Sequence, residues 1–108
     1  MIRQAIQLEF VASVANSEVE SKTFALYQNQ PNPFTSETSI SFRLPESGRA
    51  TLRVFSAEGR LVKTVIGEFA EGNNVITFRK GDFGSTGVFY YELETPKHSD
   101  RKKMILMD

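Results

Sequence analysis

The feature that most restricts the fold of this chain is a repeated alternation of apolar and polar residues in short runs. In residues 38–44, for example, Ile40, Phe42 and Leu44 alternate with serine and arginine, and Pro-Glu-Ser-Gly follows. A period of two residues places one set of side chains on one face of a strand, whereas a helix requires a period near 3.6. We find no helical period anywhere in the sequence. The chain therefore favours an all-β fold.

Further runs of this kind predict strands at residues 6–14, 50–55, 60–66, 75–78, 88–93 and 101–107. Two of them form a hairpin across Ser56-Ala57-Glu58-Gly59, in which Gly59 is free to take a positive φ. Residues 67–74, 80–87 and 95–100 are predicted loops, because they are polar and carry glycine, asparagine or proline. About seven short strands with turns between them predict an antiparallel β-sandwich of immunoglobulin-like shape.

The 108 residues suffice for one domain with a single core. Residues 24–108 form the predicted sandwich, and the polar residues 15–23 read as a linker. The strand at residues 6–14 either packs on the sandwich or ends a preceding domain. The N-terminus lacks the basic start and long apolar run of a signal peptide. We therefore expect either that the protein stays where it is made or that Met1 begins a fragment of a longer chain.

Charge and composition exclude several classes of partner. Lysine and arginine number 13, and so do aspartate and glutamate, so no overall field attracts nucleic acid or an anionic membrane. No apolar run has the roughly 18 to 20 residues of a membrane helix. Cysteine is absent, which excludes disulfides and thiolate metal sites. We expect no cofactor, no nucleic-acid partner and no small-molecule ligand.

Groups suited to catalysis are few. His98 lies in a polar turn, where we expect a solvated side chain, and a single histidine without cysteines does not form a zinc site. Asp82 and Asp100 are isolated loop acids. Glu92 and Glu94 project from one face of a predicted strand, as a carboxylate pair acting on a sugar would, although exposed polar alternation explains them equally well. Glycines 81, 84 and 87 lack the Lys-Ser/Thr of a phosphate loop. We expect no enzymatic activity.

A proline-rich segment, LYQNQPNPF at residues 26–34, precedes the first strand of the sandwich. Pro31 and Pro33 fix their own φ and bias the preceding residues toward extended conformations, which predicts a stiff extended or turn segment. Asn32 sits where its side chain can bond its own backbone. Phe34 is expected to pack against the core.

The last predicted strand begins with three cations, Arg101, Lys102 and Lys103. They can be solvated charges that protect an edge strand from aggregation. Alternatively, the strand is a recognition tail, because a terminal strand can be added to another sheet without threading.

From residue 26 to 108 the sequence resembles the C-terminal sorting domain of proteins exported by the type IX secretion system of Bacteroidetes-like bacteria. The resemblance rests on the order and spacing of several motifs: LYQNQPNPF, the strand ending in Leu44-Pro45, LRVFSAEGRLVKTV, Gly72-x-x-x-Ile76-x-Phe78, Gly87-Val88-Phe89-Tyr90-Tyr91 and the closing Lys102-Lys103-Met104-Ile105-Leu106. Phe78 and Phe89 stand where tryptophan and tyrosine are frequent in the family, and both keep an aromatic side chain.

The resemblance implies an address tag for a cargo that is secreted or displayed on the cell surface. Such a cargo enters the periplasm by a signal peptide, and the tag directs it through an outer-membrane translocon. A surface sortase-like protease then usually removes the tag, and the cargo is often attached to lipopolysaccharide. Residues 15–23 lie where processing occurs in related proteins. The family associates recognition with the hairpin and the last strand, here Gly59, Arg60, Lys102, Lys103, Met104, Ile105, Leu106 and Met107. Residues that match structural motifs of the family are Pro31, Asn32, Pro33, Phe34 and Gly87.

Two other functions stay open at this point. An immunoglobulin-like adhesion or carbohydrate-binding module would use Phe55, Tyr90 and Tyr91 as stacking surface. The other is a structural cap resembling the flagellar hook-scaffolding sandwich, which has a similar Gly-Arg hairpin and a similar Gly-Val-Tyr strand. A homodimer through an exposed strand edge, with exchange of the strand at residues 6–14, is a further expectation.

Overall fold

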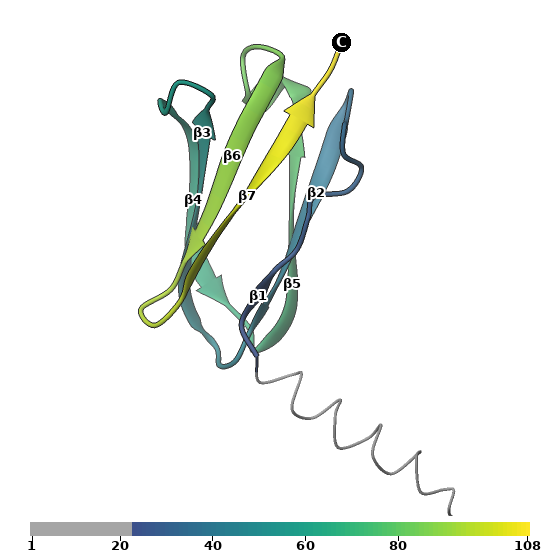
Figure 1. Ribbon diagram of the computed structural model, residues 1–108. Coiled ribbons are helices and arrows are strands. Elements are labelled where there is room, and N and C mark those ends of the chain that lie inside the picture. The colour runs from purple at the N-terminus through teal and green to yellow at the C-terminus, as the bar shows by residue number, and fades with distance from the viewer. Residues whose placement is uncertain (1–22) are drawn as a thin grey trace, which may run out of the picture.

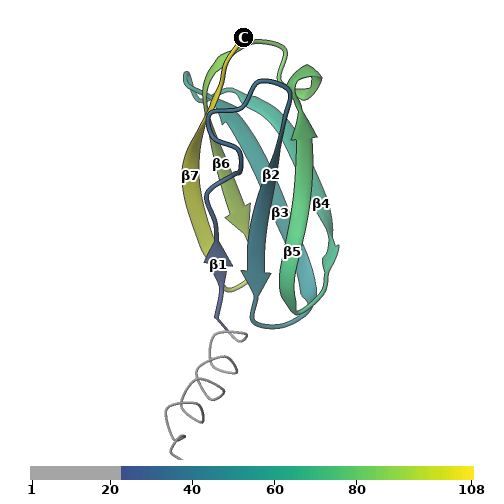
Figure 2. The same cartoon turned by 90° about the vertical axis from the view of Figure 1, so that its right-hand side faces the viewer.

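Two antiparallel β-sheets face each other in the computed structural model, which describes residues 23–108 (Figures 1 and 2). The strands are β1 (Ala25–Leu26), β2 (Glu37–Leu44), β3 (Gly48–Ser56), β4 (Leu61–Phe69), β5 (Gly72–Arg79), β6 (Gly87–Glu94) and β7 (Ser99–Leu106), and a short 3-10 helix, η1 (Lys80–Asp82), precedes β6. One sheet has the order β1-β2-β5 and the other β4-β3-β6-β7. The predicted immunoglobulin-like sandwich is confirmed. The strand expected at residues 6–14 and the linker up to residue 22 lie outside the described residues.

The alternation seen in the sequence separates the core from the surface. In β2, Ile40, Phe42 and Leu44 are buried and the residues between them are partly exposed. In β3, Leu52 and Val54 are buried in the same manner. The core lies between the two sheets, and each buried large aliphatic or aromatic side chain contributes roughly 1.5–3 kcal/mol by leaving water. Its members are Leu26, Phe34, Ile40, Phe42, Leu44, Ala50, Leu52, Val54, Phe78, Phe83, Phe89, Tyr91, Leu93, Met104 and Leu106.

The prediction that residues 67–74 form a loop is wrong. Gly67 continues β4 opposite Ala50, and Asn74 lies in β5 opposite Phe42. Only residues 70 and 71 connect the two strands. Glycine and asparagine have poor strand propensity, but the neighbouring strands supply hydrogen-bonding partners for their backbones. The length of the partner strand, and not local composition, decides where these strands end.

The last strand is also displaced from its predicted position. β7 begins at Ser99, which pairs with Glu94, and it ends at Leu106. Ser99 and Asp100 are therefore strand residues and not part of the turn, and Met107 lies beyond the strand. The polar residues Ser99 and Asp100 pair with β6 because that strand extends to Glu94.

The proline segment passes from one sheet to the other (Figure 2). The N–H of Gln30 donates to the carbonyl of Ser39 on β2 at 2.9 Å, and Ser39 returns a bond of 2.8 Å. Four residues later the N–H of Phe34 donates to the carbonyl of Ile105 on β7 at 3.0 Å, and the carbonyl of Phe34 accepts from Met107 at 2.8 Å. Both X-Pro bonds of the segment are cis. The segment thereby closes one side of the sandwich, as a strand that switches sheets does.

The opposite side of the sandwich is formed by β4 and β5. Within residues 23–108, β4 pairs with β3 alone and β5 pairs with β2 alone. Val62, Val65 and Ile76 point into the sandwich there but are only partly buried. Within the described part of the chain, one side of the sandwich is therefore closed by a chain segment and the other presents two unpaired strand edges.

The candidate recognition surface

The outer edge of β7 is covered by the proline segment. The side-chain amide of Gln28 donates to the carbonyl of Lys103 at 2.6 Å, and the side-chain oxygen of Asn32 accepts from the N–H of Ile105 at 3.0 Å. The predicted bond of Asn32 to its own backbone is thus replaced by a bond to β7. Phe34 is 1% exposed, so its predicted place in the core is confirmed. The first and last motifs of the chain therefore form one structural unit.

Tyr91 fixes the start of the same segment from inside the core. Its hydroxyl donates to the carbonyl of Tyr27 at 2.8 Å and accepts from the N–H of Asn29 at 2.8 Å. Burial raises the pKa of Tyr91 to about 12; the charge of Asp100 adds to this, and the bond from Asn29 opposes it. Because Tyr91 is 0% exposed, it cannot stack on a sugar, and this part of the carbohydrate-binding alternative is wrong.

A buried polar pair supports the segment, and sequence reasoning missed it. The side-chain amide of Asn29 donates to the hydroxyl of Thr38 at 2.9 Å and to the carbonyl of Pro31 at 3.2 Å. The hydroxyl of Thr38 donates to the same carbonyl at 2.9 Å. Asn29 and Thr38 are each 1% exposed, so these bonds compensate for the loss of water. The only signal in the sequence is that both residues belong to the motifs quoted above.

The residues that resemblance assigns to recognition on β7 fall into two groups. Met104 and Leu106 are 0% and 1% exposed and belong to the core. Lys102 and Ile105 are partly buried, whereas Lys103 and Met107 are exposed. Lys102, Lys103, Ile105 and Met107 are therefore the candidates that a partner can reach when the domain is folded.

The hairpin turn carries the other two candidates. Gly59 has φ of +90°, which confirms the expected positive value, and its N–H donates to the carbonyl of Ser56 at 2.9 Å. Arg60 is exposed, and its N–H donates to the hydroxyl of Ser56 at 3.1 Å. Ser56 pairs with Phe89, which pairs with Met104, so the turn and the C-terminal end of β7 share one end of the sandwich (Figure 1).

The remaining motif residues lie at this end or beside it. Gly87 begins β6 with φ of +131°, opposite Leu106. Pro31 and Pro33 are exposed on the covering segment. The structure thus brings the predicted hairpin, the last strand and the proline segment into one region.

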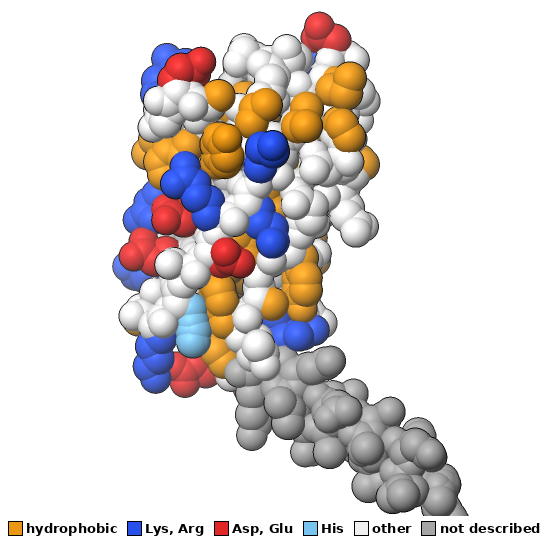
Figure 3. All heavy atoms as spheres, in the orientation of Figure 1, with side chains coloured by type: hydrophobic (Ala, Val, Ile, Leu, Met, Phe, Trp, Pro, Cys, Tyr) orange, Lys and Arg blue, Asp and Glu red, His pale blue; other side chains and the backbone are white. Residues whose placement is uncertain are grey.

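On the outer face of the four-stranded sheet, aromatic and cationic side chains lie side by side. Phe55, Tyr90 and Lys103 are neighbours across three strands. The guanidinium of Arg101 lies 5.5 Å from the ring centre of Phe55 and 5.2 Å from that of Tyr90. In Figure 3 hydrophobic side chains gather over the upper part of this view, with cationic side chains among them. The rings of Phe55 and Tyr90 are thus in cation–π contact with Arg101 of the same chain.

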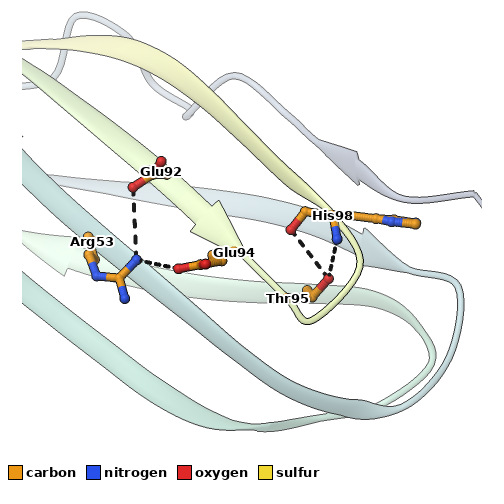
Figure 4. Close-up of polar contacts among 5 residues, drawn as sticks. All are labelled: Arg53, Glu92, Glu94, Thr95 and His98. Atoms are coloured by element: carbon orange, nitrogen blue, oxygen red, sulfur yellow. Dashed lines mark hydrogen bonds and ion pairs between the residues drawn. The ribbon is translucent and has the colours of Figure 1, made fainter.

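The two carboxylates on β6 share one arginine as their partner. A guanidinium nitrogen of Arg53 lies 2.7 Å from Glu94 and 3.9 Å from Glu92 (Figure 4). The three side chains project from an exposed sheet face, where such pairs contribute about 0–1 kcal/mol. The expectation that both glutamates share one face is confirmed, and their environment is that of a surface ion pair.

His98 is not simply solvated, contrary to the prediction. Its ring is partly buried edge-on against Phe24, with ring centres 5.0 Å apart, and Nδ1 is buried without a hydrogen-bond partner in the described residues. The turn is held by Thr95, whose hydroxyl accepts from the N–H of His98 at 3.0 Å (Figure 4). The ring of His98 therefore packs against Phe24 at this end of the sandwich.

Asp82 is also structural and not isolated. Its carboxylate accepts from the N–H of Arg79 at 2.8 Å and lies 3.6 Å from the ammonium of Lys63. Residues 23–108 contain no group of three or more histidine, cysteine, aspartate or glutamate side chains that could hold a metal. In the same part of the chain, no helix has the length and hydropathy required to cross a bilayer.

These features define a class of protein: a small β-sandwich whose distinctive groups are a covered terminal strand, an exposed turn and a cationic aromatic face. The chain matches the model of the secretion system C-terminal sorting domain over residues 28–107, and it belongs to that family. The family is the sorting signal of type IX secretion and is not a catalytic one. A search among curated proteins finds no match. The resemblance stated from the motifs is confirmed, and with it a role in a secreted or cell-surface cargo that engages the secretion machinery.

Proposed function

We propose that residues 24–108 direct a cargo from the periplasm across the outer membrane by binding the type IX translocon. The observation that carries this proposal is that the exposed turn residue Arg60 and the C-terminal end of β7 lie at the same end of the sandwich. Two segments 40 or more residues apart in sequence thereby form one end of the sandwich, which a single partner can contact. Lys103 and Ile105 on β7 and Met107 just after it supply the accessible part of the C-terminal segment, and Met104 and Leu106 hold the strand in place.

Removal of the tag by a surface sortase-like protease is the second part of the proposal. Ala25 pairs with Arg43, next to the turn between β2 and β3, so β1 begins at the end remote from Arg60. A protease that cuts within residues 15–23 would approach this end while the translocon holds the other. Attachment of the released cargo to lipopolysaccharide follows from the same family role.

A reporter secretion assay tests the function. A periplasmic reporter enzyme with a signal peptide is fused to residues 1–108 and expressed in a bacterium that has type IX secretion. We expect the reporter outside the cell, and we expect it in the periplasm when residues 102–108 are deleted. Because the deletion removes two core residues, a second fusion replaces only the exposed Arg60 and Met107 by alanine. Export of the reporter without residues 24–108 would contradict the proposal.

We also propose that the chain forms a homodimer through a free strand edge. β4 is nine residues long, and Leu61 and Ile66 on it are 52% and 61% exposed. A long edge of this kind can pair with its copy across a two-fold axis. Light scattering over a range of concentrations should give a mass between one and two chains, and Ile66→Lys should shift it to one. A constant monomeric mass would exclude the dimer.

A further inference from the structure

We propose that the outer face of β3, β6 and β7 binds an acidic, partly apolar surface of a protein in the secretion machinery. The docking face consists of Phe55, Tyr90, Arg101, Lys103 and Ile105, which are adjacent in the register of the sheet. The inference rests on the proposed sorting function and adds the face of contact and the chemistry of the partner.

The first argument is the distribution of ion pairs. Ion pairs with both partners inside residues 23–108 join carboxylates to Arg49, Arg53, Lys63, Lys80 and Lys97. None of the ion pairs in this part of the chain includes Arg101 or Lys103. The docking face therefore carries positive charge that no carboxylate of residues 23–108 pairs with, and carboxylates on a partner complement it.

The second argument is the position of the Arg101 side chain. Glu92 lies directly across from Arg101 in the register, so an internal ion pair is close at hand. The guanidinium lies instead over the rings of Phe55 and Tyr90. The cation–π contacts with both rings restrain the guanidinium, and its N–H groups can still bond a carboxylate of a partner. A restrained group loses less entropy on binding, which favours a specific contact.

The third argument is the composition around the cations. Val88 pairs with Ile105 on the same face, and both are only partly buried. Met107, which follows β7, is 50% exposed. Tyrosine and arginine with apolar neighbours are the residues that carry most of the binding energy in protein interfaces.

The charge pattern favours a protein over an anionic membrane. Further down the same face, Glu92 and Glu94 share the single cation of Arg53, so that part of the face has an excess of negative charge. A flat anionic lipid surface would meet both parts at once, and the chain as a whole has no net charge. Sequence segments that recognise anionic lipid typically carry a cluster of about four to eight cations, and the docking face has two. A protein surface can place its carboxylates opposite Arg101 and Lys103 alone.

Charge reversal in the secretion reporter tests the inference. The variant Arg101→Glu with Lys103→Glu should reduce export about tenfold or more, because the charges would repel the partner. The matched control, Arg49→Glu with Lys97→Glu, makes the same change in net charge at cations that are already paired and should leave export unchanged. Thermal unfolding of both variants excludes loss of fold, and Arg101→Gln gives a milder form of the change. Equal export by the test and control variants would overturn the inference.

Crosslinking identifies what lies on the docking face. A photoreactive amino acid at position 103 should form an adduct with a membrane protein through a peptide rich in aspartate and glutamate. The same amino acid at Thr77, exposed on the other sheet, should not form it. Adducts with lipid or lipopolysaccharide alone, or binding of the chain to phosphatidylglycerol vesicles that the charge reversal abolishes, would overturn the inference in favour of a membrane.

The outcomes separate the inference from the function on which it rests. If deletion of residues 24–108 stops export and the charge reversal does not, the sorting function stands and the docking face is wrong. If the wild-type fusion is not exported in a strain whose own cargo is secreted, the sorting function fails and the inference falls with it.

Discussion

Tyr91 joins two parts of the chain through one hydroxyl group. It donates to the carbonyl of Tyr27 and accepts from the N–H of Asn29, and these residues lie more than 60 positions away in sequence. We expect Tyr91→Phe to lower the free energy of unfolding by about 1–3 kcal/mol, because two backbone groups lose their partner in the interior. Urea unfolding measures the change. Tyr90→Phe, on the exposed face, is the control and should cost much less.

The pKa of Tyr91 makes the stability depend on pH in alkali. Its value of about 12 in the folded chain lies above the ordinary 10.0, because burial disfavours the phenolate. The stabilisation is therefore fully present below pH 10 and is lost as the pH rises through 12. We expect the midpoint of urea unfolding to fall steeply across this window in the wild type and less steeply in Tyr91→Phe. Parallel curves for the two proteins would contradict this assignment.

At the scale of single residues, the sequence predicts burial well and partners poorly. The sequence predicts Phe34 in the core because it follows two prolines, and Ile40 because it belongs to an alternating run. Both side chains are buried. Asn32 was expected to bond locally, but its partner, Ile105, lies 73 residues further along. Periodicity reports which face a side chain occupies, whereas a long-range hydrogen bond depends on how the sheets are stacked.

At the scale of the element, the β3–β4 turn allows conformation to be separated from recognition. Gly59 has φ of +90°, and no atom lies within 4 Å of the position a Cβ would take. Gly59→Ala should thus destabilise the domain by about 1–2 kcal/mol through backbone strain alone. Gly59→Asn should cost less, since asparagine tolerates positive φ better. If export follows the melting temperature across both variants, Gly59 acts through the turn; a loss of export in a fully stable variant would show direct contact.

Pattern in the sequence predicts β2 to β7, but it predicts neither the two-residue strand β1 nor the ends of the longer strands. The hairpin around Gly59 was predicted because its apolar pattern and its turn residues agree. The residues around Gly67 and Asn74 were predicted as loop because their composition is typical of turns, and they pair with β3 and β2. Local composition is a weak guide where a longer neighbouring strand offers hydrogen bonds.

At the scale of the whole molecule, the two sides of the sandwich differ. The β4 and β5 edges are free within the described residues, whereas the β7 edge is covered by residues 28–34. No pattern in the sequence predicts this covering. The segment pairs with β2 first and with β7 afterwards, and both pairings depend on how the two sheets are stacked. The partner proposed above would therefore reach β7 through its outer face and its end and not through its edge.

Removal of the covering segment should convert β7 into an aggregation-prone edge. A chain that begins at residue 36 leaves the carbonyl of Lys103, both backbone groups of Ile105 and the N–H of Met107 without the partners described above. An uncovered edge strand pairs readily with other chains. We expect oligomers by size-exclusion chromatography with light scattering and fast amide exchange at Ile105 and Met107. A chain that begins at residue 23 keeps every bond named here and should show slow exchange at both positions. If the shorter chain stays monomeric with slow exchange at Ile105, the segment is not what protects β7, and recognition through the edge becomes the better explanation.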